Sequence, residues 1–435
     1  MAKPKIVFVG AGSHFGWTLS RDVLSRENLR GGTLALTDPH EGRLAATTAF
    51  VQKMIDEHDL PTRLESSTDR TEVLADADFV VTSIAVGGRA YTGEPFYSEV
   101  MIPKKYGVDQ SVADTIGVGG IFRFLRTAPV MVDICADMER LCPNALLLNY
   151  TNPMAMLTWA CAVSSPIPNV GLCHSVQGTN RELASYLGVD ASQTTYRCGG
   201  INHQAWFTEY RLNGEDLYPR LRAAMDDPAI AARDSVRFEM LRYFGYFVTE
   251  STRHNSEYVP WFRKDPETMA RLGLEPRTPP AAAEEGVRES LYKRYYQEDG
   301  TLKPTELGVS HEFASAIIEA GVTGQPFLFA GNVMNSGLIP NLPEGCCVEV
   351  PCVADRNGVT PTHFGELPAP CAAINRTNVN VQELAVQAFL ARDRDLAFQA
   401  CALDPLCAAV LPLPRIRELF DELWAAEGPL LAYFD

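Results

Sequence analysis

Short apolar runs alternate with amphipathic segments along the first third of the chain. The apolar runs have the length and the flanking turn residues typical of strands, and the segments between them repeat apolar residues at helical spacing. This alternation predicts a doubly wound parallel sheet, which is the Rossmann-like form of the α/β class. The predicted strands lie within residues 5–12, 32–38, 77–88 and 144–153, and the predicted helices within 18–27, 41–58 and 123–141.

The pattern changes from about Gly171 onward. Residues 195–214 are rich in strand-forming residues, and residues 233–262 form a charged, aromatic stretch that reads as helical. Residues 380–401 predict one strong amphipathic helix. Proline, glycine and small residues at 273–286 predict a surface loop or a short linker.

A chain of 435 residues with 46% hydrophobic residues is long enough for two domains that share a large core. We expect a Rossmann-like domain over residues 1–170 and an α+β domain, of the lactate and malate dehydrogenase kind, over residues 171–435. No apolar run reaches the length of a membrane span. The first strand-like run begins so close to Met1 that we expect no export signal.

Charge and cysteine usage narrow the function to a small-molecule enzyme. The net charge is −16, which argues against nucleic acid and anionic membranes as partners because both need clustered Lys and Arg. The 11 cysteines are irregularly spaced and include the neighbours Cys346 and Cys347, which is typical of reduced thiols. We therefore expect a cytoplasmic enzyme.

A glycine-rich turn follows the first predicted strand and precedes a helix, as a dinucleotide site requires. Gly10 allows the tight turn, Gly12 lets backbone N–H groups approach a pyrophosphate, and Ser13 and Gly16 complete the GxGxxxG spacing. The second predicted strand ends in Asp38, whose carboxylate suits the adenosine ribose hydroxyls and repels a 2′-phosphate. The pattern predicts NAD in preference to NADP. The alternative is a plain strand-to-helix turn in which Asp38 only caps the next helix.

A dehydrogenase of the malate or lactate kind would also need a His–carboxylate pair and an Arg for a substrate carboxylate, and no such set stands out. What stands out is "NYTNP" at 149–153, the neighbours Cys173 and His174, and "CGGINH", which ends at His203. A thiolate and an imidazole together suit a divalent transition metal. Two or three protein ligands would leave positions open for substrate oxygens, as at a catalytic site. The alternative for each residue alone is a buried Cys or a satisfied core His.

With these motifs the sequence resembles the NAD- and metal-dependent family-four glycosidases over nearly its full length. Within that family it is most similar to the bacterial α-galactosidase branch, because the four residues from the metal-binding Cys track the substrate and here read "CHSV". The matching motifs, in family order, are "FVGAGS", "VADTIGVGGIFRFLRTAP", "NYTNPM", "GLCHSVQGT", "CGGINH", "FGYFVTES", "EYVPWF" and "NLPEGCCVEV".

The resemblance implies a glycosidase that departs from the usual scheme of two carboxylates. The sugar is oxidised at C3 by NAD, deprotonated at C2, and loses its C1 substituent by elimination, after which water adds and the hydride returns. The net reaction is hydrolysis of a small α-galactoside. The resemblance also implies Mn²⁺, with Fe²⁺, Co²⁺ or Ni²⁺ as other ions that a thiolate holds, and a homo-oligomer.

The resemblance assigns roles to named residues. Cys173 and His203 are the expected metal ligands, and Asn152 is the residue expected to touch the sugar hydroxyls near the metal. His174 occupies the position of the acid that protonates the departing aglycone, although some relatives carry Asp there. Cys173, His174 and His203 lie in residues 171–435, which are the expected metal- and substrate-binding domain, whereas Asn152 lies in the expected NAD-binding domain.

Two further residues complete the expected catalytic set. Tyr258 of "SEYVPWF" is the expected base at C2, and a nearby cation or metal must lower the pKa of its phenol, which is ordinarily about 10. Asp114 of "VADTIG" matches a carboxylate that increases this basicity. The alternatives are a core aromatic whose hydroxyl is satisfied for Tyr258 and a turn cap for Asp114.

Other functions stay open at this point. An α-galacturonidase or α-glucuronidase of the same family would need a cation for the C6 carboxylate, and a phospho-sugar hydrolase would carry a different block after the Cys. A NAD-dependent hydroxy-acid or sugar dehydrogenase would accumulate NADH, whereas a hydrolase leaves no net NADH. A sensor without turnover would not need the whole metal and base set. The basic residues near the motifs are Arg89, Lys104, Lys105, Arg123 and Arg253.

Overall fold

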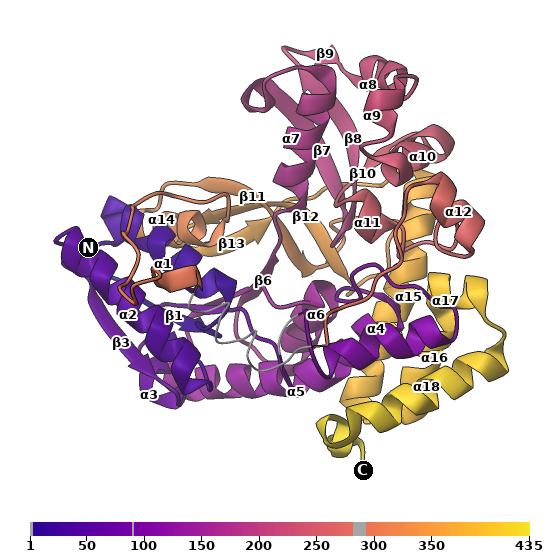
Figure 1. The fold of residues 1–435 in the computed structure, drawn as a ribbon. Helices are drawn as coiled ribbons and strands as arrows, with labels where there is room; N and C mark the ends of the chain where they lie inside the picture. Colours follow the sequence, from indigo (N-terminus) through magenta and orange to yellow (C-terminus); the bar gives the residue numbers. More distant parts are fainter. Residues whose placement is uncertain (1–2, 89–90, 282–292) are drawn as a thin grey trace.

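The computed structural model describes residues 3–88, 91–281 and 293–435 (Figure 1). Its first six strands lie side by side and run parallel in the order β3-β2-β1-β4-β5-β6, which is the order of the dinucleotide-binding doubly wound fold. The predicted Rossmann-like sheet is therefore confirmed. The strands are β1 (Lys5–Val9), β2 (Thr33–Thr37), β3 (Arg63–Ser67), β4 (Phe79–Thr82), β5 (Leu146–Asn149) and β6 (Asn169–Leu172).

The sheet continues without a break into the second half of the chain. β11 pairs antiparallel with β6, β12 pairs with β11, and the long β7–β8 hairpin joins β12 through Glu349 and Gly200. The expected domain boundary at residue 170 falls inside β6, so one sheet serves both halves. The remaining strands are β7 (Thr194–Ile201), β8 (Gln204–Leu212), β9 (Glu215–Asp216), β10 (Phe247–Val248), β11 (Phe327–Met334), β12 (Cys347–Asp355) and β13 (Gly358–Pro361).

The three helices predicted for the first third are confirmed as α1, α2 and α5, although α5 begins earlier, at Gly117. In Figure 1 the β7–β8 hairpin rises from the body of the molecule together with α7 to α10. The helices up to α9 are α1 (His14–Ser25), α2 (Glu41–Glu57), α3 (Thr71–Leu74), α4 (Phe96–Lys105), α5 (Gly117–Leu141), α6 (Met154–Ser164), α7 (Ser175–Leu187), α8 (Tyr218–Ala224) and α9 (Pro228–Ala231). The later helices are α10 (Ser235–Phe244), α11 (Thr252–Asn255), α12 (Pro266–Arg271), α14 (Ala314–Thr323), α15 (Ala369–Ala391), α16 (Arg394–Leu403), α17 (Pro405–Val410) and α18 (Leu413–Glu427).

Two sequence predictions are wrong in extent. The single helix predicted over 380–401 is broken, because Arg392 takes a left-handed φ of 53° and the side chain of Asp393 caps the start of α16. The stretch 233–262 is helical only in α10 and α11, since Gly245 ends α10 in a left-handed conformation. The loop predicted at 273–286 is irregular from 274 to 281, and its later residues lie outside the described residues.

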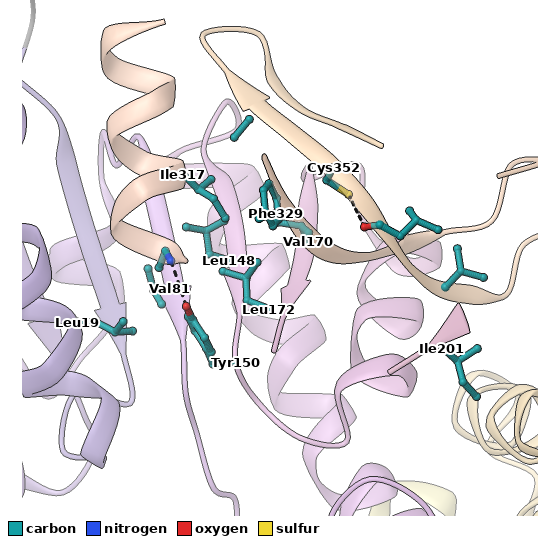
Figure 2. Packing of buried hydrophobic residues seen from close by; sticks show 14 of the residues in the cluster. Leu19, Val81, Leu148, Tyr150, Val170, Leu172, Ile201, Ile317, Phe329 and Cys352 are labelled. Atoms are coloured by element: carbon teal, nitrogen blue, oxygen red, sulfur yellow. Dashed lines mark hydrogen bonds between the residues drawn. The ribbon is translucent and has the colours of Figure 1, made fainter. Parts of the chain in front are cut away.

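The parallel strands are buried on both faces, so successive side chains of β5 enter different parts of the core. Leu148 packs in one hydrophobic cluster and Leu147 in the other. Figure 2 shows Leu148 beside Val170 and Phe329, where the parallel and antiparallel parts of the sheet meet. Each fully buried side chain of this size contributes about 1.5–3 kcal/mol. Among the described residues, no helix has the length and apolarity that a membrane crossing needs.

Candidate active site

The glycine turn lies where β1 and β2 end. Gly10 has a left-handed φ of 87°, and a Cβ there would lie 2.2 Å from the carbonyl oxygen of Ser83, so only glycine fits. The Gly12 N–H donates to the Asp38 carboxylate at 2.9 Å, and the Ser13 hydroxyl lies 3.3 Å from the Ser83 hydroxyl. The structure thus brings together the four residues predicted to bind the cofactor.

This turn fits a dinucleotide. Helix α1 has no side-chain cap and no acidic residue in its first turn, so its unpaired N–H groups and positive end are available to a phosphate. Asp38 accepts a second backbone hydrogen bond from His40 at 2.9 Å, and it is His40 that caps α2. The alternative in which Asp38 caps the next helix is therefore wrong. Its contact with a ribose stays a prediction.

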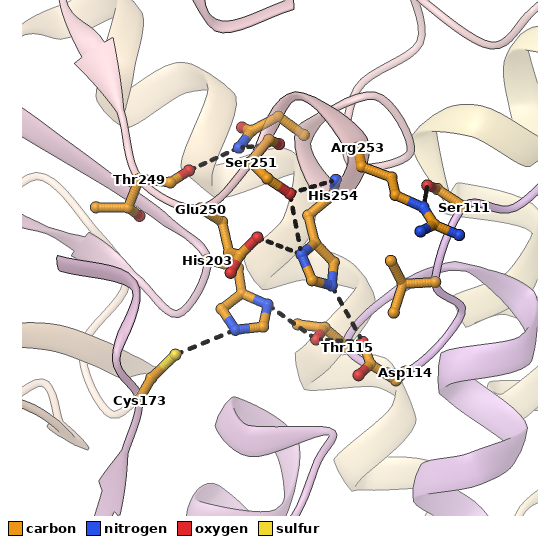
Figure 3. Close-up of polar contacts among 12 residues, drawn as sticks. Ser111, Asp114, Thr115, Cys173, His203, Thr249, Glu250, Ser251, Arg253 and His254 are labelled. Carbon is orange, nitrogen blue, oxygen red and sulfur yellow. Dashed lines mark hydrogen bonds and ion pairs between the residues drawn. The ribbon is translucent and has the colours of Figure 1, made fainter. Parts of the chain in front are cut away.

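Cys173 and His203, which are 30 residues apart in sequence, meet in the structure (Figure 3). The sulfur of Cys173 lies 3.2 Å from Nε2 of His203. The other ring nitrogen, Nδ1, lies 2.9 Å from the Tyr258 hydroxyl and 3.0 Å from the Thr115 hydroxyl. Because His203 has a left-handed φ of 60°, the tight turn between β7 and β8 directs its ring toward the sulfur.

The pair fits an open site for a divalent transition metal. Nε2 faces the soft sulfur ligand, and the hydroxyl groups on Nδ1 fix the tautomer, as the second layer of a metal site does. Within the described ranges, no group of three or more His, Cys, Asp or Glu side chains is arranged to enclose an ion. Such a site would leave several coordination positions to the substrate.

Burial sets the protonation of the two ligands. It raises the pKa of the Cys173 thiol to about 11, with the charge of Glu349 as the next cause, and it lowers the pKa of His203. Metal binding must therefore remove the thiol proton, while His203 is already neutral. We expect Mn²⁺ affinity to rise about tenfold per pH unit between neutral pH and the thiol pKa, as titration calorimetry in buffers of different ionisation heat will show. A pH-independent affinity would contradict a thiolate ligand.

Asp114 is the polar centre of the site. Its carboxylate accepts hydrogen bonds from Tyr91 at 2.8 Å, from Asn152 at 3.3 Å and from Thr115 at 2.9 Å. Because Thr115 also bonds His203, Asp114 is connected to the metal pair through one hydroxyl group. The structure therefore places Asn152 and Asp114 next to each other. The hydrogen bond that Asn152 donates holds its side-chain amide against the Asp114 carboxylate.

His254 supplies a positive charge beside this carboxylate. Its Nε2 lies 3.7 Å from Asp114, and its Nδ1 bonds Glu250. Burial alone would raise the pKa of Asp114, but the nearby charged imidazole of His254 outweighs burial and holds that pKa well below the usual range. Burial opposes the charge on His254, and Glu250 and Asp114 raise the pKa of that imidazole well above its ordinary value. Asp114 is thus an anion held between donors.

Tyr258 is 2% exposed, and its hydroxyl touches His203 and not open solvent. Burial, followed by the charges of Glu257 and Asp114, raises the pKa of this phenol well above 10. A base at this position therefore needs a cation against it to ionise near neutral pH, as the sequence predicted. The position beside a metal ligand would provide one.

His174 begins α7 next to Cys173, and its side chain is 53% exposed. Its Nδ1 lies 3.4 Å from Glu312, and the hydrogen bond that the imidazole donates to this carboxylate raises the pKa of His174 to about 9. The imidazole is therefore protonated at neutral pH. A partly exposed, protonated imidazole beside the metal pair has the properties of a proton donor to a leaving group.

The sequence predictions missed several residues of the site. Glu250 and His254 stand four residues apart in "ESTRH", which is followed by "NSEY", and this carboxylate–imidazole spacing close to Tyr258 was a usable signal. Tyr91 and Glu312 carried no local signal, since they come from loops far away in sequence. Of the basic residues near the motifs, Arg123 lies over the Tyr91 ring at 5.2 Å, whereas Arg89 lies outside the described residues.

Comparisons with known proteins match this chain along most of its length. Residues 5–189 match the family model described as family 4 glycosyl hydrolase. Residues 198–407 match the model for the C-terminal domain of the same family.

Two named relatives are similar over almost the whole chain. The alpha-galactosidase of Bacillus subtilis (strain 168) is 41% identical over 431 residues, which cover 98% of this chain and 99% of the relative. The alpha-galactosidase of Rhizobium meliloti (strain 1021) is 37% identical over 455 residues, which cover 100% of this chain and 90% of the relative.

Solved structures share the fold. A 6-phospho-alpha-glucosidase from gut microorganisms, determined in complex with NAD and Mn²⁺, superposes with a TM-score of 0.79 at 20% identity and covers 99% of each chain. The malate dehydrogenase of Plasmodium falciparum, in complex with NADH, superposes with a TM-score of 0.54 at 14% identity over 91% of this chain and 99% of that chain. The predicted similarity of the fold to that of malate dehydrogenases is confirmed.

Proposed function

Because the chain belongs to glycosyl hydrolase family 4, we propose that this site hydrolyses α-galactosides by oxidation at C3, deprotonation at C2, elimination and addition of water. The observation that carries the proposal is the contact of Cys173 with His203 beside the Asp114 network, on the sheet that also holds the glycine turn. The two alpha-galactosidases at 41% and 37% identity support the galactoside in particular.

The enzyme is an NAD- and divalent-metal-dependent glycosidase. When bound, NAD supplies a hydride acceptor and a divalent ion, with Mn²⁺ as the expected one, supplies a Lewis acid. Gly10, Gly12, Ser13 and Asp38 would hold the dinucleotide, as the uncapped start of α1 and the exclusion of a Cβ at Gly10 support.

The site residues divide the remaining work between them. Cys173 and His203 would hold the ion, and Asn152, which Asp114 orients, would bind sugar hydroxyls. Tyr258 would take the C2 proton, and Asp114 would increase its basicity through the Thr115 and His203 contacts. His174, held by Glu312, would give a proton to the departing aglycone oxygen.

Assembly and location are parts of the same proposal. We infer a homo-oligomer, as in the sequence-based expectation, and a reducing cytoplasm. The free state of all 11 cysteines supports the second inference, since each of them is buried as a thiol.

A product assay tests the function. The enzyme with NAD⁺, Mn²⁺ and reductant is given 4-nitrophenyl α-galactoside and 4-nitrophenyl α-galacturonide side by side, and both nitrophenol and NADH are followed by absorbance. We expect nitrophenol from the galactoside and no net NADH. Faster release from the galacturonide would overturn the galactoside assignment, and accumulation of NADH without release of nitrophenol would indicate a dehydrogenase.

A further inference from the structure

The loop that carries Asp114 and Thr115 contains no helix or strand between α4 and α5. Its conformation includes Ala113 at a left-handed φ of 58°, which a residue with a side chain adopts only when its surroundings impose it. Both site residues follow this strained position directly. A contact that fixes the backbone of residues 111–113 therefore also positions Asp114 against Tyr91 and Thr115 against His203.

One buried carboxylate holds the loop. Glu257, which is 1% exposed, accepts hydrogen bonds from three successive backbone N–H groups: from Ser111 at 2.5 Å, from Val112 at 3.0 Å and from Ala113 at 3.3 Å. Successive N–H groups that converge on one anion form a concave nest, and hydrogen bonds to a charged acceptor are stronger than those between neutral groups. The carboxylate thus stabilises the left-handed turn before Asp114.

The same carboxylate is one residue away from Tyr258. The Glu257 side chain therefore connects the segment that carries Tyr258 with the loop that carries Asp114. The carbonyl of Tyr258 accepts a hydrogen bond from Asn378 at 3.2 Å, which fixes this end of the link to α15. Arg263 adds a second link, because its guanidinium bonds Ser256 at 2.8 Å and also pairs with Asp109.

We propose that Glu257 is a positioning residue that sets the distance between Asp114 and Tyr258. The expected effect on kcat rests on the proposed function, whereas the contact of Glu257 with the loop is independent of that function. Glu257 makes no direct bond to Cys173 or His203 among the described contacts, but His203 bonds the hydroxyl groups of Thr115 and Tyr258, which lie in the two segments that Glu257 joins.

The test compares Glu257→Gln with wild type as full-length enzyme carrying NAD⁺ and Mn²⁺. An amide offers one neutral acceptor oxygen and an NH₂ group that repels the N–H donors. We expect kcat to fall about 10–100-fold, because displacement of a supporting group by about 1 Å has costs of this size. The dissociation constant of NAD⁺ should stay close to wild type, and that of Mn²⁺ should change less than kcat does. Glu239→Gln is the matched control, since its carboxylate pairs with Arg271 near the surface, and it should keep wild-type kcat.

A second readout does not depend on turnover. Amide hydrogen exchange, followed by mass spectrometry, should become faster at residues 111–113 in Glu257→Gln and stay unchanged at the turn that carries His203. This exchange tests the positioning role even if the enzyme fails to act on galactosides, which the wild-type assay decides separately. If Glu257→Gln does not fold, Glu257→Asp keeps the charge with a shorter reach and should show the same pattern at smaller size.

Two results would overturn the inference. One is a folded Glu257 variant with wild-type kcat and wild-type exchange at the loop. The other is a loss of kcat accompanied by an equal loss of metal and NAD⁺ affinity, which would indicate a general structural role. If both Glu257 variants fail to fold, hydrogen exchange in the wild-type enzyme decides. The amides of residues 111–113, which donate to Glu257, should exchange slowly, and fast exchange there would count against the inference.

Discussion

Tyr258→Phe will lower kcat about 10²–10⁴-fold, which is the usual contribution of a positioned general base. Binding of NAD⁺ and Mn²⁺ should stay close to wild type. His203 loses one partner in this variant but keeps the Thr115 hydroxyl at 3.0 Å from Nδ1, so its ring remains oriented. Steady-state kinetics together with titration of each cofactor will separate the two effects.

Tyr295→Phe is the control for this variant. Tyr295 is also buried, and its hydroxyl bonds Thr47 at 3.1 Å, far from the metal pair in the fold. It should cost about 1 kcal/mol of stability and leave kcat unchanged. If Tyr258→Phe turns over like wild type, Tyr258 is a core aromatic whose hydroxyl only supports His203.

Cys173→Ser will weaken Mn²⁺ binding by more than the 10–100-fold typical of changes in the second layer, and activity will be lost at ordinary metal concentrations. A serine hydroxyl would replace one of the two proposed protein ligands, Cys173 and His203. Exhaustive chelation of the wild type should have the same consequence. Affinity is measured by titration calorimetry and activity over a range of added Mn²⁺.

Cys352→Ser is the matched control, since this buried thiol contacts the carbonyl of Val350 and lies outside the site. A serine hydroxyl at position 352 still reaches the Val350 carbonyl oxygen as its acceptor, so metal affinity and turnover should both be retained. Retention of metal affinity and turnover in Cys173→Ser would show that the sulfur is not a ligand.

The parts of the site that depend on chemically specific residue types could be predicted. Gly10 and Gly12 indicate a turn by residue type alone. Gly10 has a left-handed backbone conformation, and the backbone of Gly12 lies close to the Asp38 carboxylate. The contact between Cys173 and His203 could be predicted across 30 residues because thiol and imidazole are scarce and chemically specific. In both cases the residue type itself indicates the local structure or the partner that it has in the fold.

The charged network around Asp114 could not be predicted in this way. Tyr91 comes from the loop before α4, whereas His254 and Glu257 come from α11 and the turn after it, and Asp, Glu and Tyr occur throughout the chain. Strand β3 was missed for a related reason: it lies at the sheet edge and contains Leu64 as its one large apolar residue. In each case the partner that decides the role comes from the tertiary fold.

The most direct test of the mechanism is the isotope content of the product. Wild-type enzyme is allowed to hydrolyse an α-galactoside in D₂O, and the released galactose is analysed by mass spectrometry and NMR for deuterium at C2. Proton removal at C2 predicts deuterium there, together with a primary isotope effect on kcat for substrate deuterated at C2. Galactose released with hydrogen at C2 and without an isotope effect would contradict the account, because hydrolysis by two carboxylates never breaks that bond.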